Sequence, residues 1–574
     1  MNTTNVFFKV LFLAGIFFLL DGNIFAQSKN EVRVHILSDP ESLIPYNSNF
    51  AEEINIENQI FETLLRMNPV TCEPDIPWLA ESLPIESKDH KQFEFTLRKG
   101  IKFADGVELT GEDVIFSLKA AKNFLLTENQ SLQTYLEPIK SAELIDGDLY
   151  RIRFTLEKPD WQIRKVVFAS ILTILPKHIF KYENNLDGYS WEDLEKRDSA
   201  KNYDALENFT KWFKSPDIQR DPKFILGTGP YKLKEWITND KVVLEKNPNY
   251  SNVFNSEYGN AYPDKIIYKQ VSDWNAAVIA IKIKDLDLIG YIPSAQWNNV
   301  DTVKYSYLSK TAFPQSTYGY VGWNLERPLF KDKKVRLALA YLLDRKTMID
   351  KVLYGLGEQT QTPVSKSRPE YNSEIPLITY DTIIAKKLLK EAGWEDHDGD
   401  GVIDKKINGK YVPFKFEFVI NSGNETRKKI LLVYAEDLRK VGIQADIMAL
   451  EWSIYIERLR NHQLDAWFGA WQNDDGENDF YQLYHSSQAK NRGSNYGGWN
   501  NKRADHILEV IRNETSQSKR KKLEKEFQKI FYEDQPVALM WNPCTPVIWN
   551  NRFDNVKWYS LRPGYNPAWW IPKK

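Results

Sequence analysis

The sequence predicts the α/β fold class, and three observations lead to this prediction. The chain has 574 residues, which is enough for more than one packed domain. Its composition is that of a globular protein, with 42% hydrophobic and 27% charged residues. Strand-like and helix-like patterns alternate along the chain, and such alternation is typical of α/β units.

Four short stretches have the pattern of β-strands. The segments "FEFTL" (93–97) and "YRIRFTL" (150–156) alternate between apolar and polar residues, as half-buried strands do. The segments "KVVLEK" (241–246) and "KFEFVI" (415–420) are predicted strands as well. Segment 181–222 is rich in Asn, Asp and Tyr, and we expect it to be irregular.

Helix signals stand between these strands. Thr110 is a good N-cap for the stretch that follows it, so a helix is expected to begin there. A second amphipathic helical region is predicted to open at Asp332 and to stop near Gly355. A third helix is expected to end at Gly393, and segment 504–534 contains two further helical stretches.

Charge and motif content exclude several function classes. The chain has 76 basic and 78 acidic residues, so its net charge of -2 gives no general reason to expect nucleic acid as a partner. The sequence contains no H-E-x-x-H metal spacing, no G-x-S-x-G elbow and no phosphate-binding loop. An enzyme is therefore not expected, although a converging pair of carboxylates for glycoside hydrolysis stays open.

The N-terminus has the pattern of a secretory signal peptide over residues 1–26. Lys9 precedes an apolar run from Val10 to Leu20, which is about half of the ~20 residues needed to span a bilayer. Ala26 offers a small residue for cleavage, and an uncleaved anchor is the alternative. No Cys follows the run, so a lipid anchor is not expected. No other stretch is long and apolar enough to span a membrane, so the cleaved protein is expected to have no stable membrane anchor.

The chain has only two cysteines, Cys72 and Cys544. An exported protein could join them in a disulfide, and two free, buried thiols are the alternative. Two cysteines cannot form a Cys-rich zinc site.

Five motifs follow one another in a fixed order. They are "LRKGIKFADGVELTGEDVIFSLK" (97–119), "LGTGPYKLKEW" with "LEKNPNY" (226–250), "WNLERPLFKDKKVRLALAYLLDRKTMI" (323–349), "AKKLLKEAGW" (385–394) and "FYQLYHSS" with "GSNYGGWNN" (480–501). Each motif alone is weak. Together they resemble the extracytoplasmic solute-binding proteins of ABC importers, specifically the dipeptide/oligopeptide-binding family, over nearly all of the mature chain.

This resemblance implies a two-lobed periplasmic-binding-protein-like fold of type II, which bends at a hinge and carries an extra domain inserted in lobe one. Lobe I would comprise residues 27–62, 222–300 and 548–574. The extra domain would span 63–221, and lobe II would span 301–547. In this fold the ligand binds between the lobes, and the lobes close over it.

An acidic stretch in lobe II is the first candidate for the ligand site. The segment "WQNDDGENDF" (471–480) holds four carboxylates and no Lys or Arg. The resemblance implies that Trp471 and either Asp474 or Asp475 meet the α-amino group of a peptide. A buried ammonium requires a paired carboxylate, which suits this role. Asp479 resembles a structural acid of the family, and a solvated acidic loop is the alternative for the whole stretch.

The resemblance also implies further ligand-binding positions. Main chain near the first strand would hold the peptide backbone as an added strand, at Ser38, Asp39 and Pro40. For the aromatic residues among the remaining candidates, a position in the core is the alternative. These remaining candidates are Trp323, Asn324, Asn495, Tyr496 and Trp499.

A second acidic stretch, "DHDGDGVID", begins with the spacing of a calcium loop, in which oxygens converge on a hard cation. The bidentate Glu of such loops is missing, because position 12 is Ile407. A structural calcium is one interpretation and a well-hydrated turn is the other. The residues concerned are Asp396, Asp398, Asp400 and Asp404. No other cofactor is expected.

The sequence thus predicts a monomeric periplasmic binding protein that captures peptides and delivers them to an ABC permease. The competing hypothesis is a binding protein for oligosaccharides of the cello or chito type. The chain contains 18 Trp, and Trp faces stack well on sugar rings. A sugar has no ammonium, so under this hypothesis Asp474 and Asp475 would accept hydroxyl hydrogens or stay solvated.

Overall fold

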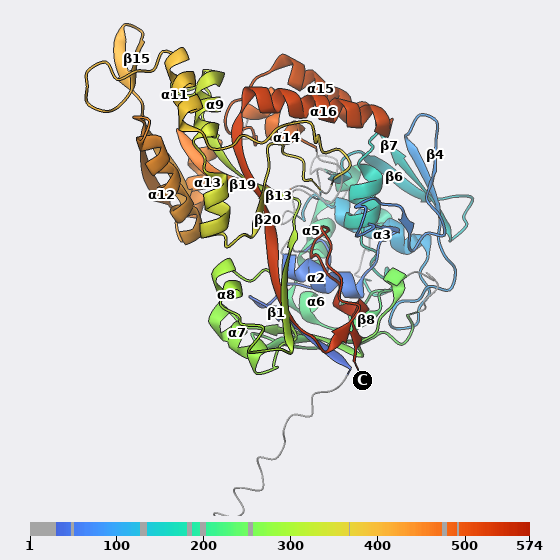
Figure 1. Cartoon of the computed structure of the whole chain (residues 1–574). Coiled ribbons are helices and arrows are strands. Elements are labelled where there is room, and N and C mark those ends of the chain that lie inside the picture. Colours follow the sequence, from blue (N-terminus) through green and yellow to red (C-terminus); the bar gives the residue numbers. More distant parts are fainter. Residues whose placement is uncertain are drawn as a thin grey trace, which may run out of the picture.

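The computed structural model shows two lobes joined by long strands, with the extra domain packed on lobe I (Figure 1). The structure describes residues 30–47, 51–126, 132, 135–180, 186–195, 202–250, 257–366, 368–472, 479–490 and 493–573. The predicted signal peptide, 1–26, lies outside the described residues. The names lobe I, extra domain and lobe II are kept for the parts of the chain defined above.

Within the described residues, one sheet of 12 strands runs through both lobes. Its lobe I strands are β1 (Glu31–Ile36), β8 (Tyr231–Ile237), β9 (Lys241–Lys246), β10 (Lys265–Gln270) and β11 (Leu288–Ile289). Its lobe II strands are β13 (Thr317–Trp323), β14 (Gly357–Gln359), β17 (Lys415–Asn421), β18 (Gln444–Leu450) and β19 (Ala466–Gln472). The predicted strands at 241–246 and 415–420 are confirmed by β9 and β17.

The lobes are connected by β20 (Val537–Asn550) and by the passage from β12 (Leu308–Pro314) to β13. The first half of β20 pairs with β13 and β14, and its second half pairs with β12 and β11. A strand that is shared in this way can bend without losing its pairing on either side. The pairing places the crossing between the lobes near residues 314–317 and 543–544, while the limits of the domains stay predictions.

Lobe I is built on a mixed part of the sheet, in which β10 and β9, and β9 and β8, pair antiparallel, and helix α2 (Ala51–Ile60) packs in the same core. Strand β1 runs parallel to both β10 and β11, and its side chains at 32, 34 and 36 are buried. The motif "GTGPY" lies against the end of α2, because the N–H of Gly229 donates to the carbonyl of Ile60 at 2.8 Å. A side chain at Gly227 would overlap that same carbonyl. These glycines therefore have a packing role.

In the described part of the extra domain, four strands form an antiparallel sheet in the order β4-β5-β7-β6. Its main elements are β4 (Ile85–Glu86), β5 (Gln92–Thr96), β6 (Ile139–Leu144), β7 (Arg151–Leu156), α3 (Gly111–Lys122) and the π-helix η1 (Ile163–Ile171). The predicted strands at 93–97 and 150–156 are confirmed by β5 and β7. Helix α3 begins after Thr110 as predicted, and the N–H of Thr110 donates to the Asp113 carboxylate at 2.8 Å.

Segment 181–222 was expected to be irregular, and that expectation is wrong for part of it. Two helices lie there, α5 (Tyr203–Phe213) and α6 (Pro216–Arg220). Leu206, Phe209 and Phe213 form one buried face of α5, because they follow one another at helical spacing. The many polar residues of the segment hide this short apolar stripe.

Helices pack on both faces of the lobe II part of the sheet and form two separate apolar cores. They are α9 (Lys333–Tyr341), α10 (Arg345–Thr347), the π-helix η6 (Met348–Val352), α11 (Thr382–Glu391), α12 (Glu425–Arg439), α13 (Trp452–Arg460), α14 (Tyr481–Tyr484), α15 (Lys502–Asn513) and α16 (Gln517–Asp534). Asp332 caps α9 as predicted. The helical region then breaks after Tyr341, and Asp344 caps a new turn by accepting the N–H of Thr347.

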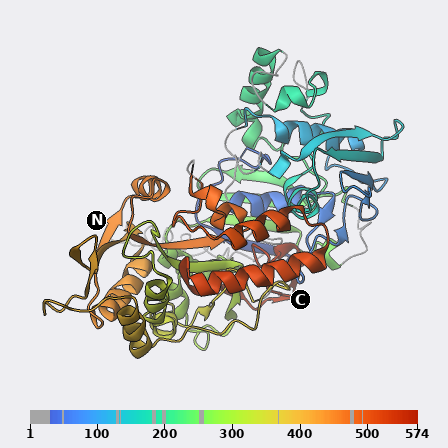
Figure 2. The same ribbon diagram turned by 90° about the horizontal axis from the view of Figure 1, so that it is seen from above.

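Seen from above, the extra domain and helices α11 and α12 lie at opposite ends of the molecule, with α16 between them (Figure 2). Cys72 and Cys544 both lie within the described residues, and no disulfide joins them. Among the described residues, the helices are too short or too polar for any of them to cross a membrane.

Candidate ligand-binding site

Strand β19 carries the residue that precedes the acidic stretch. Trp471 pairs in register with Tyr318 of β13, so its backbone is held inside the sheet. Its half-buried ring stacks on Tyr496, with ring centres 5.8 Å apart and planes 21° apart. Residues 473–478 lie outside the described residues, so the predicted roles of Asp474 and Asp475 stay predictions.

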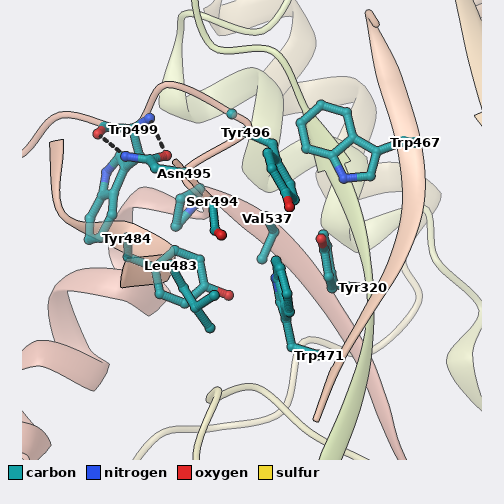
Figure 3. Close-up of a pocket in the computed structure, with 12 residues that line it drawn as sticks. Tyr320, Trp467, Trp471, Leu483, Tyr484, Ser494, Asn495, Tyr496, Trp499 and Val537 are labelled. Carbon is teal, nitrogen blue, oxygen red and sulfur yellow. Dashed lines mark hydrogen bonds between the residues drawn. The ribbon is translucent and has the colours of Figure 1, made fainter. Parts of the chain in front are cut away.

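A pocket of about 20 Å³ opens beside Trp471, and only lobe II residues line it. Figure 3 shows Trp471, Tyr320 and Tyr496 on one side of this space and Leu483 and Tyr484 on the other. We call it the aromatic pocket. Its lining consists of Tyr320, Trp467, Trp471, Leu483, Tyr484, Ser494, Asn495, Tyr496, Gly497, Trp499, Pro536 and Val537. Four of the predicted site residues therefore come together here, namely Trp471, Asn495, Tyr496 and Trp499.

The size of the aromatic pocket limits what it can take. A space of this volume holds about one water-sized group, because one water needs roughly 10–15 Å³. An ammonium is of that size, whereas a sugar ring is much larger. The faces of aromatic rings attract a cation with about 0.5–2 kcal/mol, and more when the cation is desolvated. The chemistry of the pocket therefore suits a small cationic group.

Tyr320 also lines this pocket, although the sequence did not predict it as a site residue. It belongs to β13 and lies opposite Gly469 of β19. A side chain at Gly469 would overlap the Tyr320 ring, so the glycine is what allows the ring to lie across the neighbouring strand. Burial raises the pKa of Tyr320 well above its usual value, which keeps its hydroxyl protonated. The alternation of Gly with aromatic residues in "TYGYVGW" and "AWFGAWQ" was the signal available.

Asn495 and Trp499 form the wall of the pocket through structural bonds. Asn495 Nδ2 donates to the carbonyls of His485 and Trp499, at 3.1 and 2.8 Å, and its Oδ1 accepts the N–H of Trp499. Trp499 Nε1 donates to Asp534 at 3.2 Å. Both side chains are 3% exposed. They hold the loop that carries Tyr496, and Tyr496 is the member of this group whose ring stacks on Trp471.

Trp323 and Asn324 lie apart from the aromatic pocket. Trp323 is fully buried, and its Nε1 donates to the carbonyl of Gln535 at 3.4 Å. Asn324 Nδ2 donates to the carbonyl of His462 at 2.9 Å, and its Oδ1 accepts the N–H of Glu326. These contacts give both side chains a structural role in lobe II, and their predicted part in ligand binding stays a prediction.

Ser38, Asp39 and Pro40 follow β1 in lobe I. The hydroxyl of Ser38 donates to Glu52, so the loop is tied to the first turn of α2. Arg220 donates to the Asp39 carboxylate at 3.1 Å and to the carbonyl of Pro40 at 2.7 Å. This loop is held at the carboxyl end of β1, where open α/β sheets bind ligands.

Asp479 begins the described chain after the acidic stretch. Its carboxylate accepts the N–H of Tyr481 at 3.0 Å and pairs with Arg512 at 2.8 Å. These contacts are of the kind a structural acid makes, and the role that the resemblance implies for Asp479 stays a prediction. Asp160 of the extra domain is close to this pair, and burial raises the pKa of the Asp160 carboxyl while Arg512 opposes the shift. The extra domain therefore reaches lobe II next to the acidic stretch.

Three of the four carboxylates proposed for calcium come together. One oxygen from each of Asp396, Asp398 and Asp404 lies within 4.8 Å of the others, and Asp400 is not in this set. Asp396 already accepts the N–H groups of two glycines of the turn, and Asp404 bonds to His397 Nδ1 at 2.8 Å. The bonds to the glycines are those of a tight hydrated turn, and calcium at this place stays a prediction.

Comparison with known proteins identifies the family. A profile described as bacterial extracellular solute-binding proteins, family 5 Middle, matches residues 76–491. The chain belongs to this family. Members of family 5 are extracytoplasmic proteins that bind solutes, and the two-lobed fold expected from the sequence is the fold of their solved structures. The resemblance found in the sequence motifs is thereby confirmed.

Two family 5 relatives and one solved structure match along most of this chain. The oligopeptide-binding protein AppA of Bacillus subtilis is 33% identical over 505 residues, which is 86% of this chain and 83% of AppA. The dipeptide-binding protein of Escherichia coli is 24% identical over 480 residues, or 81% of this chain and 80% of that protein. The structure of AppA from Bacillus subtilis with a nonapeptide has a TM-score of 0.68 at 28% identity, covering 95% of this chain and 99% of that chain.

Proposed function

We propose that this protein binds peptides between its lobes and delivers them to an ABC import permease. The observation that carries this proposal is the similarity, along 86% of the chain, to a protein named for oligopeptide binding. The aromatic pocket supports it independently, because its size suits an ammonium and a peptide begins with one. No catalytic step is part of this function.

The N-terminus of the peptide would enter the aromatic pocket. The rings of Trp471, Tyr496 and Tyr320 attract its ammonium, and Asp474 or Asp475 supplies the negative charge. A charge-assisted hydrogen bond to a carboxylate is roughly twice as strong as a neutral one, so this pair anchors one end of the ligand. The backbone that follows would run as an added strand beside the loop after β1.

Delivery follows from closure of the lobes. Bending at β20 and at the β12–β13 passage brings the two faces of the cleft together over the peptide. The closed form presents one continuous surface to the permease, whereas the open form does not. The protein acts as a monomer in the periplasm, after cleavage of residues 1–26.

In lobe II, a peptide is preferred over an oligosaccharide for a physical reason. Stacking on a sugar needs a large exposed aromatic face, and Trp323, Trp499 and Trp541 are at most 5% exposed. The rings of Trp471 and Tyr496 already cover each other. The aromatic pocket is also too small for a sugar ring.

The test begins with mass spectrometry of small molecules released by denaturing the purified, exported protein. We expect peptides. Calorimetry then compares a released peptide with its N-acetylated form, and wild type with the double variant Asp474→Asn, Asp475→Asn. Acetylation and the double variant should each weaken binding at least tenfold, because each removes one charge of the pair. The double variant Asp398→Asn, Asp400→Asn, at two exposed positions of the turn at 396–404, removes the same number of charges, serves as the control and should bind as wild type. Release of oligosaccharides without peptides would contradict the proposal.

A further inference from the structure

Lobe I contains two cavities that share a wall, which we call the large and the small chamber. Their volumes are about 420 Å³ and about 210 Å³. The large chamber lies between α2, the extra domain and the C-terminal segment 559–569. The residues that line both chambers are Asn55, Gln59, Arg562, Pro563 and Tyr565.

The small chamber lies where ligands bind in open α/β sheets. Leu37 follows β1 and Gly290 follows β11, and both residues line this chamber. These two strands are parallel, so their carboxyl ends meet at one edge. A side chain at Gly290 would come within 2.9 Å of the Tyr565 hydroxyl, so the absence of a side chain there lets Tyr565 close the wall. The loop that contains Ser38 begins directly after Leu37.

Gln59 places an unsatisfied acceptor between the two chambers. Its side chain is 5% exposed, and its Oε1 has no hydrogen-bond partner among the residues that the structure describes. Buried polar atoms are nearly always paired, so an orphaned one calls for an explanation. A bound ligand with an N–H group would supply the missing donor. Peptides carry such a donor on almost every residue.

The walls of the large chamber are aromatic, and the charged side chains of the two chambers together balance in number. Tyr559, Tyr565 and Trp569 provide the rings, and Asn55 and Asn58 provide amides. The charge of Arg66 is offset by Glu62, whose carboxylate lies 4.0 Å away. Arg562 lines both chambers, and Glu52 in the small chamber supplies one opposite charge. This lining suits side chains that are apolar, aromatic or uncharged. The volume falls in the roughly 300–1,000 Å³ range of organic ligand sites, whereas the aromatic pocket holds one small group.

We propose that the two chambers form a specificity subsite for the residues of the peptide beyond its N-terminus. The chambers take uncharged side chains, with aromatic ones in the large chamber, and Gln59 Oε1 accepts an N–H of the ligand. This inference rests on the proposed function and makes it more specific. A subsite of this kind selects oligopeptides with apolar or aromatic residues over very short peptides.

Two variants separate this subsite from the rest of the cleft. Ser170→Trp changes an exposed residue of η1 and fills the large chamber. Gln59→Leu keeps the shape of the side chain and removes the acceptor. Lys140→Trp adds the same bulk at an exposed position of β6 outside both chambers and serves as the control.

Binding is measured by calorimetry with two synthetic probes, a random octapeptide mixture rich in Phe and Trp and a random tripeptide mixture. We expect Ser170→Trp to raise the octapeptide Kd at least tenfold and to leave the tripeptide Kd unchanged. Gln59→Leu should raise the octapeptide Kd about fivefold while the melting temperature of the free protein stays equal or rises, since an unmet polar atom is removed. Lys140→Trp should bind both probes as wild type does.

Wild-type octapeptide affinity in both Ser170→Trp and Gln59→Leu would overturn the subsite and leave the proposed function standing. A wild-type protein that binds neither peptide mixture would overturn both. Loss of octapeptide and tripeptide binding to the same degree would also contradict the subsite, because the variants would then act on the whole cleft.

Discussion

At the scale of single residues, glycines decide where the aromatic rings of lobe II can lie. Gly469 and Gly322 each stand opposite an aromatic residue on the neighbouring strand, Tyr320 and Trp467 respectively. A side chain at either glycine would overlap the facing ring. The rings therefore lie flat across β13 and β19, and Tyr320 reaches the aromatic pocket only because of this arrangement.

We expect Gly469→Ala to lower the free energy of unfolding by about 1–3 kcal/mol, the usual cost of overpacking a core. It should also weaken peptide binding, because the Tyr320 ring must move. Urea denaturation and calorimetry measure the two effects.

The matched control is the same substitution in a Tyr320→Ala background. There the added methyl group meets empty space, so the further loss of stability should fall to near zero. An equal loss in both backgrounds would show that backbone strain, and not the ring, is the cause.

At the scale of elements, a buried arginine fastens the end of α9 to β20. Arg345 is 1% exposed, and its Nε donates to the carbonyl of Leu539 at 2.7 Å. Its Nη1 donates to the carbonyl of Ala340 at 2.9 Å, which is one of the last carbonyls of α9. Burial lowers the pKa of Arg345 to about 10, so the side chain stays charged at neutral pH. The cation also faces the negative end of the helix.

Arg345→Met should lower the free energy of unfolding by about 2 kcal/mol, because the carbonyls of Leu539 and Ala340 lose their donor. Arg345→Lys keeps the charge without the planar fork and should recover part of this loss. Chemical denaturation of the three proteins provides the measurement. A Met variant as stable as wild type would mean that the cost of burying the charge equals the value of the bonds.

At the scale of the whole molecule, the extra domain touches lobe II. Trp161 packs against a lobe II core, and the Arg520 guanidinium of α16 lies 4.6 Å from its ring centre. Asp160 lies near the pair formed by Arg512 and Asp479. If the lobes close as proposed, three parts of the chain take part, and one of the contacts involves Asp479, the first described residue after the segment that carries Asp474 and Asp475.

Trp161→Ala should speed peptide dissociation about fivefold, because the contact between the extra domain and lobe II loses a cation–π interaction and buried ring area. Stopped-flow measurement of release of a labelled peptide tests this, and small-angle scattering should show a more open free protein. Trp191→Ala is the control, since Trp191 pairs with Lys119 within the extra domain. An equal effect of both variants would show that the extra domain is merely loosened.

Local patterns in the sequence determined much of the fold. The strands β5, β7, β9 and β17 and the cap of α3 were predicted, because each depends on neighbours within a few residues. The order of the five motifs was enough to indicate the family and thus the two lobes. Local patterns did not predict α5. They also predicted one helical region from Asp332 to near Gly355, whereas Asp344 caps a new helical turn within it.

The sites depend on residues that only the tertiary structure brings together. Tyr320, Trp471 and Tyr496 line one pocket. Gln59 lines a chamber together with Arg562 and Tyr565. No local pattern in the sequence links the residues of either site. Burial was equally hidden, since Trp323 is a core residue in a motif that also suited a ligand. The sequence determined the family, the elements and the chemistry that was available. Tertiary packing decided which of those side chains are exposed to a ligand, because exposure depends on contacts between segments hundreds of residues apart.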